Sequence, residues 1–327
     1  INLDTNVSNI ALLNTTANNI NIDNNSLTEL TITSLNTATA GTISGITNNP
    51  GNIDITSTNG ITVNNAVNTT AGTVKLTANS PLNVNANVNA GGDITLTAGE
   101  ISDAPTYADD IGVNANITST GGNIYLYAGD DIIQSTGTWI QTQTTGKTVT
   151  LTASYFDQDN HGGINSTGAI QTNNGDINIS AKDNIALNSV NANAGNMEIN
   201  STSGAITATA LTANNLDASA EDGINVSNSA LNTLTANVTE TGDITFGNEG
   251  GQITLTSVQT PNGDISITAG GDILVTYVSA IDHQVSLTSS GGGILDNNAT
   301  ATNDIFADNL IISAVTGIGS TDALETE

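Results

Sequence analysis

The chain of 327 residues contains 31 acidic and 3 basic residues, which gives a formal net charge of −28 at pH 7. Such a chain repels phosphates, and no apolar run approaches the roughly 20 residues of a transmembrane helix, so we expect neither nucleic-acid binding nor membrane insertion. Cysteine is absent, which excludes disulfides and zinc–thiolate sites. Aromatic residues make up 3% of the chain, too few for an ordinary globular core of this size.

One short phrase recurs along the chain. It begins with Gly and a small polar residue, continues with alternating apolar and polar residues, and ends with Ala or Ser; copies start at Gly51, Gly92, Gly122, Gly175 and Gly263. Each copy predicts a turn followed by a short strand with one buried face, because successive side chains of a strand point to opposite faces. Recurrence at an interval of roughly 18 to 25 residues is typical of the coils of a parallel β-solenoid.

The predicted coils follow one another in chain order, and each begins with an apolar residue. These residues are Ile10, Leu30, Ile53, Val74, Ile94, Ile124, Val149, Ile177, Met197, Leu216, Leu234, Ile265, Val285 and Leu310. Three steps are longer, at about 28 to 31 residues, which fits ordinary coils with inserted loops. The register stays open within the last long step, from Leu234 to Ile265, because Ile244 and Ile253 both begin strand-like segments there.

The apolar residues within a coil predict three short strands. In one coil, Ile177 and Ile179 belong to the first strand, Ile185 and Leu187 to the second, and Val190 to the third. A lone coil buries too few apolar side chains to offset the entropy of ordering about 20 residues, so the coils must stack. We therefore expect an all-β fold, a parallel β-helix (β-solenoid) of about 14 coils of roughly 20 residues, with residues 1–327 forming a single elongated domain. Asn residues at the turns should stack in ladders between coils.

These repeats resemble the repeat region of filamentous-haemagglutinin-type exoproteins. One example is Gly263-Asp264-Ile265-Ser266-Ile267-Thr268-Ala269-Gly270-Gly271-Asp272-Ile273. Members of that family are giant adhesins, usually exported by two-partner secretion. The resemblance covers nearly the whole chain and implies a right-handed solenoid, an extracellular or cell-surface location on a prokaryote, and an adhesive function. The amino-terminal secretion domain of the family is not recognisable in this sequence.

The two ends of the chain resemble neighbouring parts of an internal junction in such proteins. Residues 316–327 resemble the segment before the junction, and residues 1–24 resemble the Asn-rich strand pair that follows it. The chain is therefore expected to be one period of a tandem array, or one subunit of a fibre. Its partner would be another copy of itself, placed end to end, because the end of a solenoid exposes unpaired strand edges.

We expect a structural and adhesive protein without enzymatic activity: a stiff surface stalk, a fibre or a segment of biofilm matrix. Its contacts with glycans, or with a host or neighbouring cell surface, would be weak and repeated. The alternative is a carbohydrate-active β-helix enzyme, a polysaccharide lyase or hydrolase. Glu198 and Asp217 lie on successive coils and could supply the two carboxylates of a glycoside hydrolase. The three lysines lie on separate coils, where they do not form the basic cluster of a lyase.

No cofactor is expected except calcium. Residues 157–164 resemble the start of an EF-hand-type calcium loop, with Asp157 and Asp159 at its first and third positions and Gly162 at its sixth. His161 at the fifth position and Gly168 at the twelfth depart from the pattern, so the bidentate Glu is missing. Asp157 and Asp159 are the best candidate metal ligands in the sequence, and would suit a calcium-dependent surface-layer or biofilm protein. The alternative for this loop is an ordinary polar turn.

The aromatic residues gather in one part of the chain. Tyr125 and Tyr127 alternate with Ile124 and Leu126, so their rings should face outward, and Trp139 follows in the same region of long inserted loops. Exposed aromatic rings can stack on sugars or anchor protein partners. Tyr125, Tyr127 and Trp139 are therefore the candidate ligand or partner surface. The alternative is that these rings only pack beneath the loops.

Overall fold

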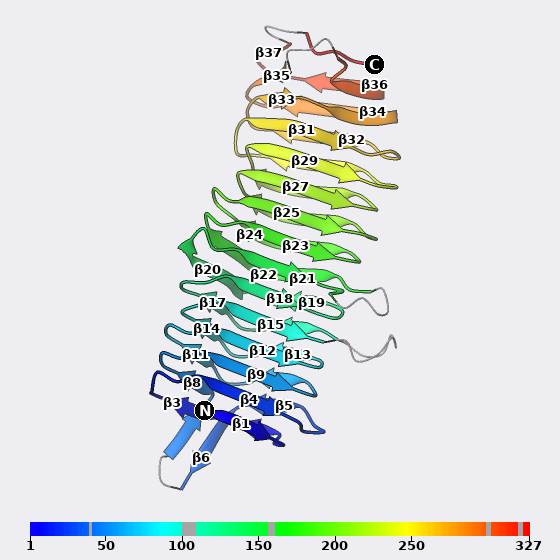
Figure 1. Cartoon of the computed structure of the whole chain (residues 1–327). Helices are drawn as coiled ribbons and strands as arrows, with labels where there is room; N and C mark the ends of the chain where they lie inside the picture. Colours follow the sequence, from blue (N-terminus) through cyan, green and yellow to red (C-terminus); the bar gives the residue numbers. More distant parts are fainter. Residues whose placement is uncertain (39–40, 100–108, 156–160, 299–301, 320–322) are drawn as a thin grey trace. The chain divides into compact units, whose positions relative to one another are not determined.

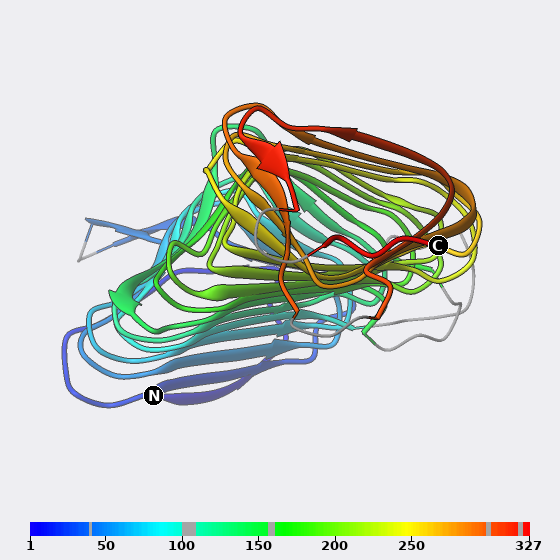
Figure 2. The ribbon, with the colours of Figure 1, turned by 90° about the horizontal axis from the view of Figure 1, so that it is seen from above.

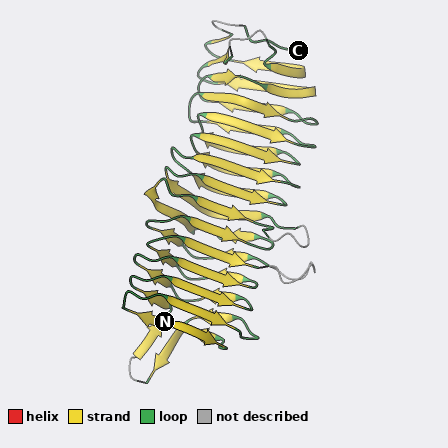
Figure 3. Cartoon of the chain, viewed as in Figure 1, coloured by secondary structure: helices red, strands yellow, loops and turns green. Residues whose placement is uncertain are grey.

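The computed structural model describes residues 1–38, 41–99, 109–155, 161–298, 302–319 and 323–327. These residues form strands and loops without any helix (Figure 3), so no described segment is a helix of the length and hydrophobicity needed to cross a membrane. The chain is an all-β parallel β-solenoid of about 14 turns, with stacked coils about 21 residues apart, as the repeats predict. It divides into two compact units, Ile1–Lys182 and Asp183–Glu327 (Figure 1).

The first unit contains three stacks of parallel strands, and each coil contributes one strand to each stack. Stack A consists of β1 (Asn2–Thr5), β4 (Ile20–Asn24), β9 (Ile53–Ser57), β12 (Val74–Ala78), β15 (Ile94–Ala98), β18 (Ile124–Tyr127), β21 (Val149–Thr152) and β23 (Ile177–Ala181). Stack B consists of β2 (Asn9–Ile10), β5 (Leu30–Ile32), β10 (Ile61–Val63), β13 (Leu82–Val84), β16 (Ile111–Val113), β19 (Ile132–Gln134) and the first half of β22 (Ile164–Asn173). Stack C consists of β3 (Leu12–Asn14), β8 (Ile46–Asn48), β11 (Val67–Thr69), β14 (Val88–Ala90), β17 (Ile117–Ser119), β20 (Trp139–Thr145) and the second half of β22.

The core of this unit is a column of aliphatic side chains on the inner faces of the stacks. Ile53, Val74 and Ile94 lie in register on successive strands of stack A, and all three are fully buried. Their neighbours Asp54 and Lys75 point to the other face of the same strands. Each buried aliphatic side chain contributes roughly 1.5–3 kcal/mol, and the same alternation repeats in stack A from β4 to β23. The predicted inward positions are therefore confirmed.

Asparagines at the corner between stacks B and C form the expected ladder. Asn85 Nδ2 donates to Asn64 Oδ1 at 3.1 Å, and Asn114 Nδ2 donates to Asn85 Oδ1 at 2.9 Å. Ser135 continues the series, because its Oγ donates to Asn114 Oδ1 at 2.6 Å. The amide side chain both donates and accepts, so one residue type can link any number of coils.

A hairpin interrupts the parallel pattern near the start of the chain. β6 (Ser34–Thr37) pairs antiparallel with β7 (Gly41–Ser44), and the two strands form a separate sheet that leaves the solenoid between β5 and β8 (Figure 1). The hairpin lengthens the coil between Leu30 and Ile53 without changing the stacks, since β5 still pairs with β10 and β8 with β11.

The second unit has two principal stacks, named D and E. Stack D consists of β25 (Asn196–Ser201), β27 (Asn215–Ala220), β29 (Thr233–Val238) and β31 (Ile253–Gln259), followed by β33 (Ile273–Val275), β35 (Gly293–Asp296), β37 (Gly317–Ile318) and the first parts of β34 (Val278–Ser289) and β36 (Ile305–Ser313). Stack E consists of β24 (Ile185–Asn191), β26 (Ile206–Thr212), β28 (Ile224–Ala230), β30 (Ile244–Asn248), β32 (Ile265–Ala269) and the last parts of β34 and β36. In Figure 2 the coils within each unit lie over one another.

The second and third strands of a coil are joined in several coils of the second unit. β24, β26 and β28 each run through a bend as one strand, whereas β10 and β11 of the first unit are separate. In β24 only residues 188 and 189 separate the inward Leu187 from Val190, while residues 64–66 separate the inward Val63 from Val67. The shorter link leaves no room for a corner turn, so the backbone ladder continues through the bend. Three separate short strands per coil are found in most coils of the first unit, although β22 is joined there, and separate second and third strands recur at β33 and β34 of the second unit.

Two strands, and not an inserted loop, fill the long step between Leu234 and Ile265. Leu234 of β29 pairs with Leu255 of β31 in stack D. Ile265 of β32 pairs with Ile244 of β30 in stack E. The expectation that Ile265 follows Leu234 in one series, after an inserted loop, was therefore wrong. The phrase specifies a turn and a strand with one buried face, and either stack accepts such a strand.

Candidate functional site

The predicted calcium ligands Asp157 and Asp159 lie outside the described residues. The described part of that loop resumes at His161, and the following Gly162 has a φ of +140°. A Cβ at Gly162 would lie 2.6 Å from the Ser154 nitrogen, so the backbone passes close to the preceding turn there. Calcium binding by Asp157 and Asp159 stays a prediction.

Three tyrosines form a cluster on the outer face of stack A. The rings of Tyr125 and Tyr127 in β18 are stacked, with centroids 6.2 Å apart and an angle of 13° between their planes. Tyr155 adds a third ring, whose centroid lies 4.5 Å from that of Tyr127. Burial, and then the neighbouring phenols of Tyr155 and Tyr125, raise the pKa of Tyr127. The alternation of residues in the sequence predicts only Tyr125 and Tyr127 on this face, and Tyr155 is the third member of the cluster.

Trp139 belongs to a different stack from these tyrosines. It begins β20 in stack C, where it is 40% exposed and donates from Nε1 to Thr118 Oγ1 at 3.2 Å. Of the three residues predicted to share a ligand surface, the structure joins Tyr125 with Tyr127 and places Trp139 with stack C. Whether they bind a ligand stays a prediction.

Four aspartates form an acidic corner next to stack B. Asp130 Oδ2 accepts from the Asp109 nitrogen at 3.1 Å, and Asp110 Oδ1 accepts from the Asp131 nitrogen at 3.1 Å. Burial raises the pKa of Asp110 to about 6; the carboxylates of Asp131, Asp130 and Asp109 raise it further, against the lowering effect of the Asp131 N–H. This corner therefore takes up a proton more readily than an exposed aspartate does.

Glu198 and Asp217 are neighbours, as the coil spacing predicts. They are directly opposite one another on β25 and β27, and both side chains are exposed on the outer face. Neither residue lines either of the two hollows of this unit that are described below. The arrangement supplies two carboxylates, but it lies outside both of these hollows.

A carboxylate triad that the sequence analysis missed lies near the last coils. Asp296, Asp304 and Glu325 each place one carboxylate oxygen within 4.8 Å of the others. Asp304 is fully buried, and its Oδ2 accepts from the Glu325 nitrogen at 3.2 Å while its Oδ1 accepts from Asn298 Nδ2. Burial is the main cause that raises the pKa of Asp304, and the charges of Asp296 and Glu325 add to it.

The triad offers oxygen ligands of the kind that calcium and magnesium prefer. Asp296 Oδ2 and Glu325 Oε2 are buried and accept no hydrogen bond from the described residues. No local motif marks these residues in the sequence. They meet because residues 325–327 return beside β36, where Thr326 bridges to Ile305.

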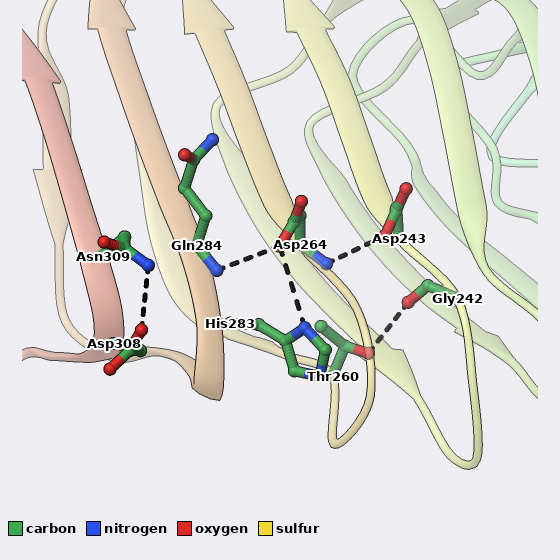
Figure 4. A network of polar contacts seen from close by, with 8 residues as sticks. All are labelled: Gly242, Asp243, Thr260, Asp264, His283, Gln284, Asp308 and Asn309. Carbon is green, nitrogen blue, oxygen red and sulfur yellow. Dashed lines mark hydrogen bonds and ion pairs between the residues drawn. The ribbon is translucent and has the colours of Figure 1, made fainter.

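A second series of aspartates runs along stack E (Figure 4). Asp243 Oδ1 accepts from the Asp264 nitrogen at 2.8 Å, and Asp264 Oδ1 accepts from the Gln284 nitrogen at 2.9 Å. His283 Nδ1 lies 3.8 Å from the same Asp264 oxygen. Each carboxylate thus satisfies a backbone N–H of the next coil. These aspartates link coils as the asparagines of the first unit do, which is a structural role.

Two adjoining hollows lie along one edge of stack D. The larger has a volume of ≈ 410 Å³ and the smaller ≈ 270 Å³, and Ile281 lines both. The larger hollow is lined by Asn237, Val238, Thr239, Gln259, Thr260, Pro261, Tyr277, Ser279 and Ile281. The smaller is lined by Ile281, Asp282, Phe306, Ala307, Asp308 and Glu327. Because they share Ile281, the two hollows are together called the edge groove below.

Comparison of the chain with protein-family models, with curated proteins and with solved structures finds no match in any of the three. The resemblance to filamentous-haemagglutinin-type repeats therefore stays a prediction based on the repeated phrases. The function has to be inferred from the geometry of the solenoid and from the chemistry of its surfaces.

Proposed function

We propose that this chain is a structural and adhesive segment of a stalk, fibre or biofilm matrix on the outside of a prokaryotic cell. Two properties support the proposal: the regular stacking of coils, and a net charge of −28 that keeps a long solenoid soluble. The absence of cysteine suits a protein exported as an unfolded chain. The chain works through length and repeated weak contacts, so that avidity replaces a single tight site.

The observation that carries the proposal is an uncovered core at the first and last described coils. Leu3 lies in register with Ile22, yet Leu3 is 38% exposed and Ile22 is 1% exposed. Leu310 lies in register with Val285, yet Leu310 is 37% exposed and Val285 is fully buried. Both coils present apolar side chains and a strand edge in the geometry that a further coil would cover.

The partner proposed for both surfaces is a second copy of the chain, stacked end to end, either as a separate molecule or as the next period of a tandem array. The last coil of one copy would then cover the first coil of the next. Residues 305–307 of β36 already bond to residues 325–327, so the later part of β36, residues 309–313, would extend the stacking to the next copy. Asp4 and Glu327 are among the carboxylates at these ends, so the two surfaces repel each other at low ionic strength. Salt or a divalent cation should therefore promote the assembly.

The experiment is sedimentation velocity of the native chain and of three variants over a range of concentrations. Leu3→Lys and Leu310→Lys each place a charge on an uncovered end, and both should keep the chain monomeric. Asn2→Lys adds the same charge to the opposite face of β1 and should still assemble. Native chain that stays monomeric at every salt and protein concentration would refute end-to-end stacking, and so would an Asn2→Lys variant that assembles no better than Leu3→Lys.

The second candidate is a carbohydrate-active enzyme that uses Glu198 and Asp217. The directly opposite positions of these residues on β25 and β27 favour it. Hydrolysis of a polysaccharide panel, abolished by Glu198→Gln and by Asp217→Asn, would establish this activity. A native chain that assembles and hydrolyses none of the panel would leave the structural function.

A further inference from the structure

The edge groove follows one row of residues across four strands of the second unit. Asn237 of β29 pairs with Gln259 of β31, which pairs with Ser279 of β34. Ser279 in turn pairs with Phe306 of β36. Both hollows contain members of this row, and they share Ile281. The groove therefore runs along the stacking direction, with one residue of the row contributed by each coil.

A bulge forms one wall of the groove. In the pairing of β34 with β36, Ala280 lies opposite Ala307 and Gln284 lies opposite Asn309. Residues 281–283 thus face the single residue 308, and the excess pushes Ile281 outward until it is 59% exposed. Asp282 takes the left-handed conformation, with a φ of +63°, to make this bend. Bulges and strained residues of this kind concentrate beside functional sites.

The lining combines aromatic rings with hydrogen-bonding groups. Tyr277 and Phe306 lie 5.7 Å apart between ring centroids, at an angle of 48°. The amide of Gln259 is exposed and can donate and accept, and the carboxylates of Asp282 and Asp308 can accept. Rings of this kind offer apolar faces, while the amide and carboxylates offer partners for hydroxyl groups.

The charge of the unit narrows the choice of ligand. All three basic residues of the chain, Lys75, Lys147 and Lys182, belong to the first unit. The charged groups that an anionic polymer would meet in the edge groove are therefore carboxylates, which repel it. A peptide that binds as an added strand is also disfavoured, because β31 and β34 already pair with strands on both sides. An uncharged chain rich in hydroxyl groups meets neither obstacle.

We propose that the edge groove binds an uncharged oligosaccharide that lies along the stacking direction. Its sugar rings pack against Tyr277 and Phe306, and its hydroxyl groups bond to Gln259, Asp282 and Asp308. Successive coils of a solenoid are ~4.8 Å apart, so consecutive sugars of an extended chain meet successive members of one row. The inference rests on the proposed adhesive function and names its ligand class and its site.

The test is isothermal titration calorimetry of the native chain against three kinds of probe. The first is a panel of neutral hexasaccharides from cellulose, mannan, xylan and β-1,3-glucan; the others are an oligogalacturonate and an oligolysine. The proposal expects binding to at least one neutral sugar and none to the oligogalacturonate. Binding to the oligolysine alone, or to none of the probes, would overturn it.

Variants then locate the site. Tyr277→Ala and Gln259→Ala should each lower the affinity for the neutral sugar about five- to tenfold. This is the size expected for one lost ring contact or hydrogen bond. Thr256→Ala, on the same β31 but outside the edge groove, should leave the affinity unchanged. Unchanged affinity in both groove variants, or loss in Tyr125→Ala instead, would overturn this site.

The result of the sugar-binding test can be distinguished from the result of the test of end-to-end assembly. Sedimentation of Tyr277→Ala and Gln259→Ala should match the native chain, because neither residue lies at an uncovered end. Sugar binding that fails while the chain still assembles would reject the groove and leave the structural function. Assembly that fails while sugar binding persists would reject the fibre and leave the groove.

Discussion

Gly91 and Gly92 share one turn but meet different surroundings. A Cβ at Gly91 would lie 2.2 Å from the Thr70 carbonyl oxygen of the preceding coil, and a Cβ at Gly92 would lie 3.2 Å from its nearest neighbours. Backbone cannot yield as a side-chain tip can, so Gly91→Ala should lower the free energy of unfolding by about 2 kcal/mol or more. Gly92→Ala should cost less than about 1 kcal/mol.

Urea unfolding of the two glycine variants checks this prediction. Both substitutions add the same methyl group, so differences in propensity largely cancel between them. Equal losses would mean that the coils are not in the close contact that the structure describes at Gly91.

Asp110 predicts a dependence of stability on pH. Its pKa is raised to about 6 in the folded chain, against roughly 3.9 in the unfolded chain. The folded state therefore binds more protons in this interval, and the contribution of Asp110 to stability falls as the pH rises through it. Asp110→Asn removes the charge and keeps an acceptor for the Asp131 N–H.

The variant should therefore be more stable than the native chain at pH 7.5, and the difference should vanish near pH 4. Thermal unfolding of both proteins across this range makes the comparison. A difference in stability that does not change with pH would show that Asp110 does not carry the raised pKa.

Sequence reasoning performs well for single inward residues and poorly for clusters. Alternation identified Leu187 and Val190 as inward, and both are buried, because a strand allows only two faces. It could not find the carboxylate triad or the pairing of Tyr277 with Phe306. Those contacts depend on which strands stack and on where the tail returns, and neither is encoded in a local pattern.

At the scale of one strand, β12 offers a matched pair of neighbours. Leu76 is fully buried, whereas Lys75 is exposed and lies 3.6 Å from an Asp54 oxygen. Leu76→Ala should cost about 2–5 kcal/mol, since it removes methyl groups from a packed column. Lys75→Ala should cost less than about 1 kcal/mol, because exposed ion pairs contribute little.

Chemical denaturation of the two β12 variants measures both values. Similar losses at the two positions, or a larger loss for Lys75→Ala, would contradict the inward and outward assignment of this strand.

Elements also show where the repeat phrase stops being informative. The phrase at Gly263 follows the same pattern as the one at Gly175, yet β32 stacks with β30 in stack E. The phrase encodes a turn and the buried face of one strand. The stack that a strand joins depends on how many strands precede that strand in its coil. This number changes at β30 and β31.

The whole chain combines a self-similar backbone with strong self-repulsion. The stacking of coils and the net charge of −28 could both be predicted from repeats and composition. The division into Ile1–Lys182 and Asp183–Glu327 could not, because the phrases continue across it with little change. The surfaces that we propose to be functional lie where regular stacking is broken, at the uncovered ends and at the bulge beside Ile281.

The most direct test of the structural function is electron microscopy of the purified native chain, first with calcium and then with chelator. We expect fibres of uniform width in calcium, with an axial spacing of ~4.8 Å from the stacked strands. Fibres that dissolve in chelator would add a structural role for calcium to this result. Isolated particles in both conditions would contradict end-to-end assembly of the solenoid, provided that the protein concentration is one at which the sedimentation coefficient no longer changes.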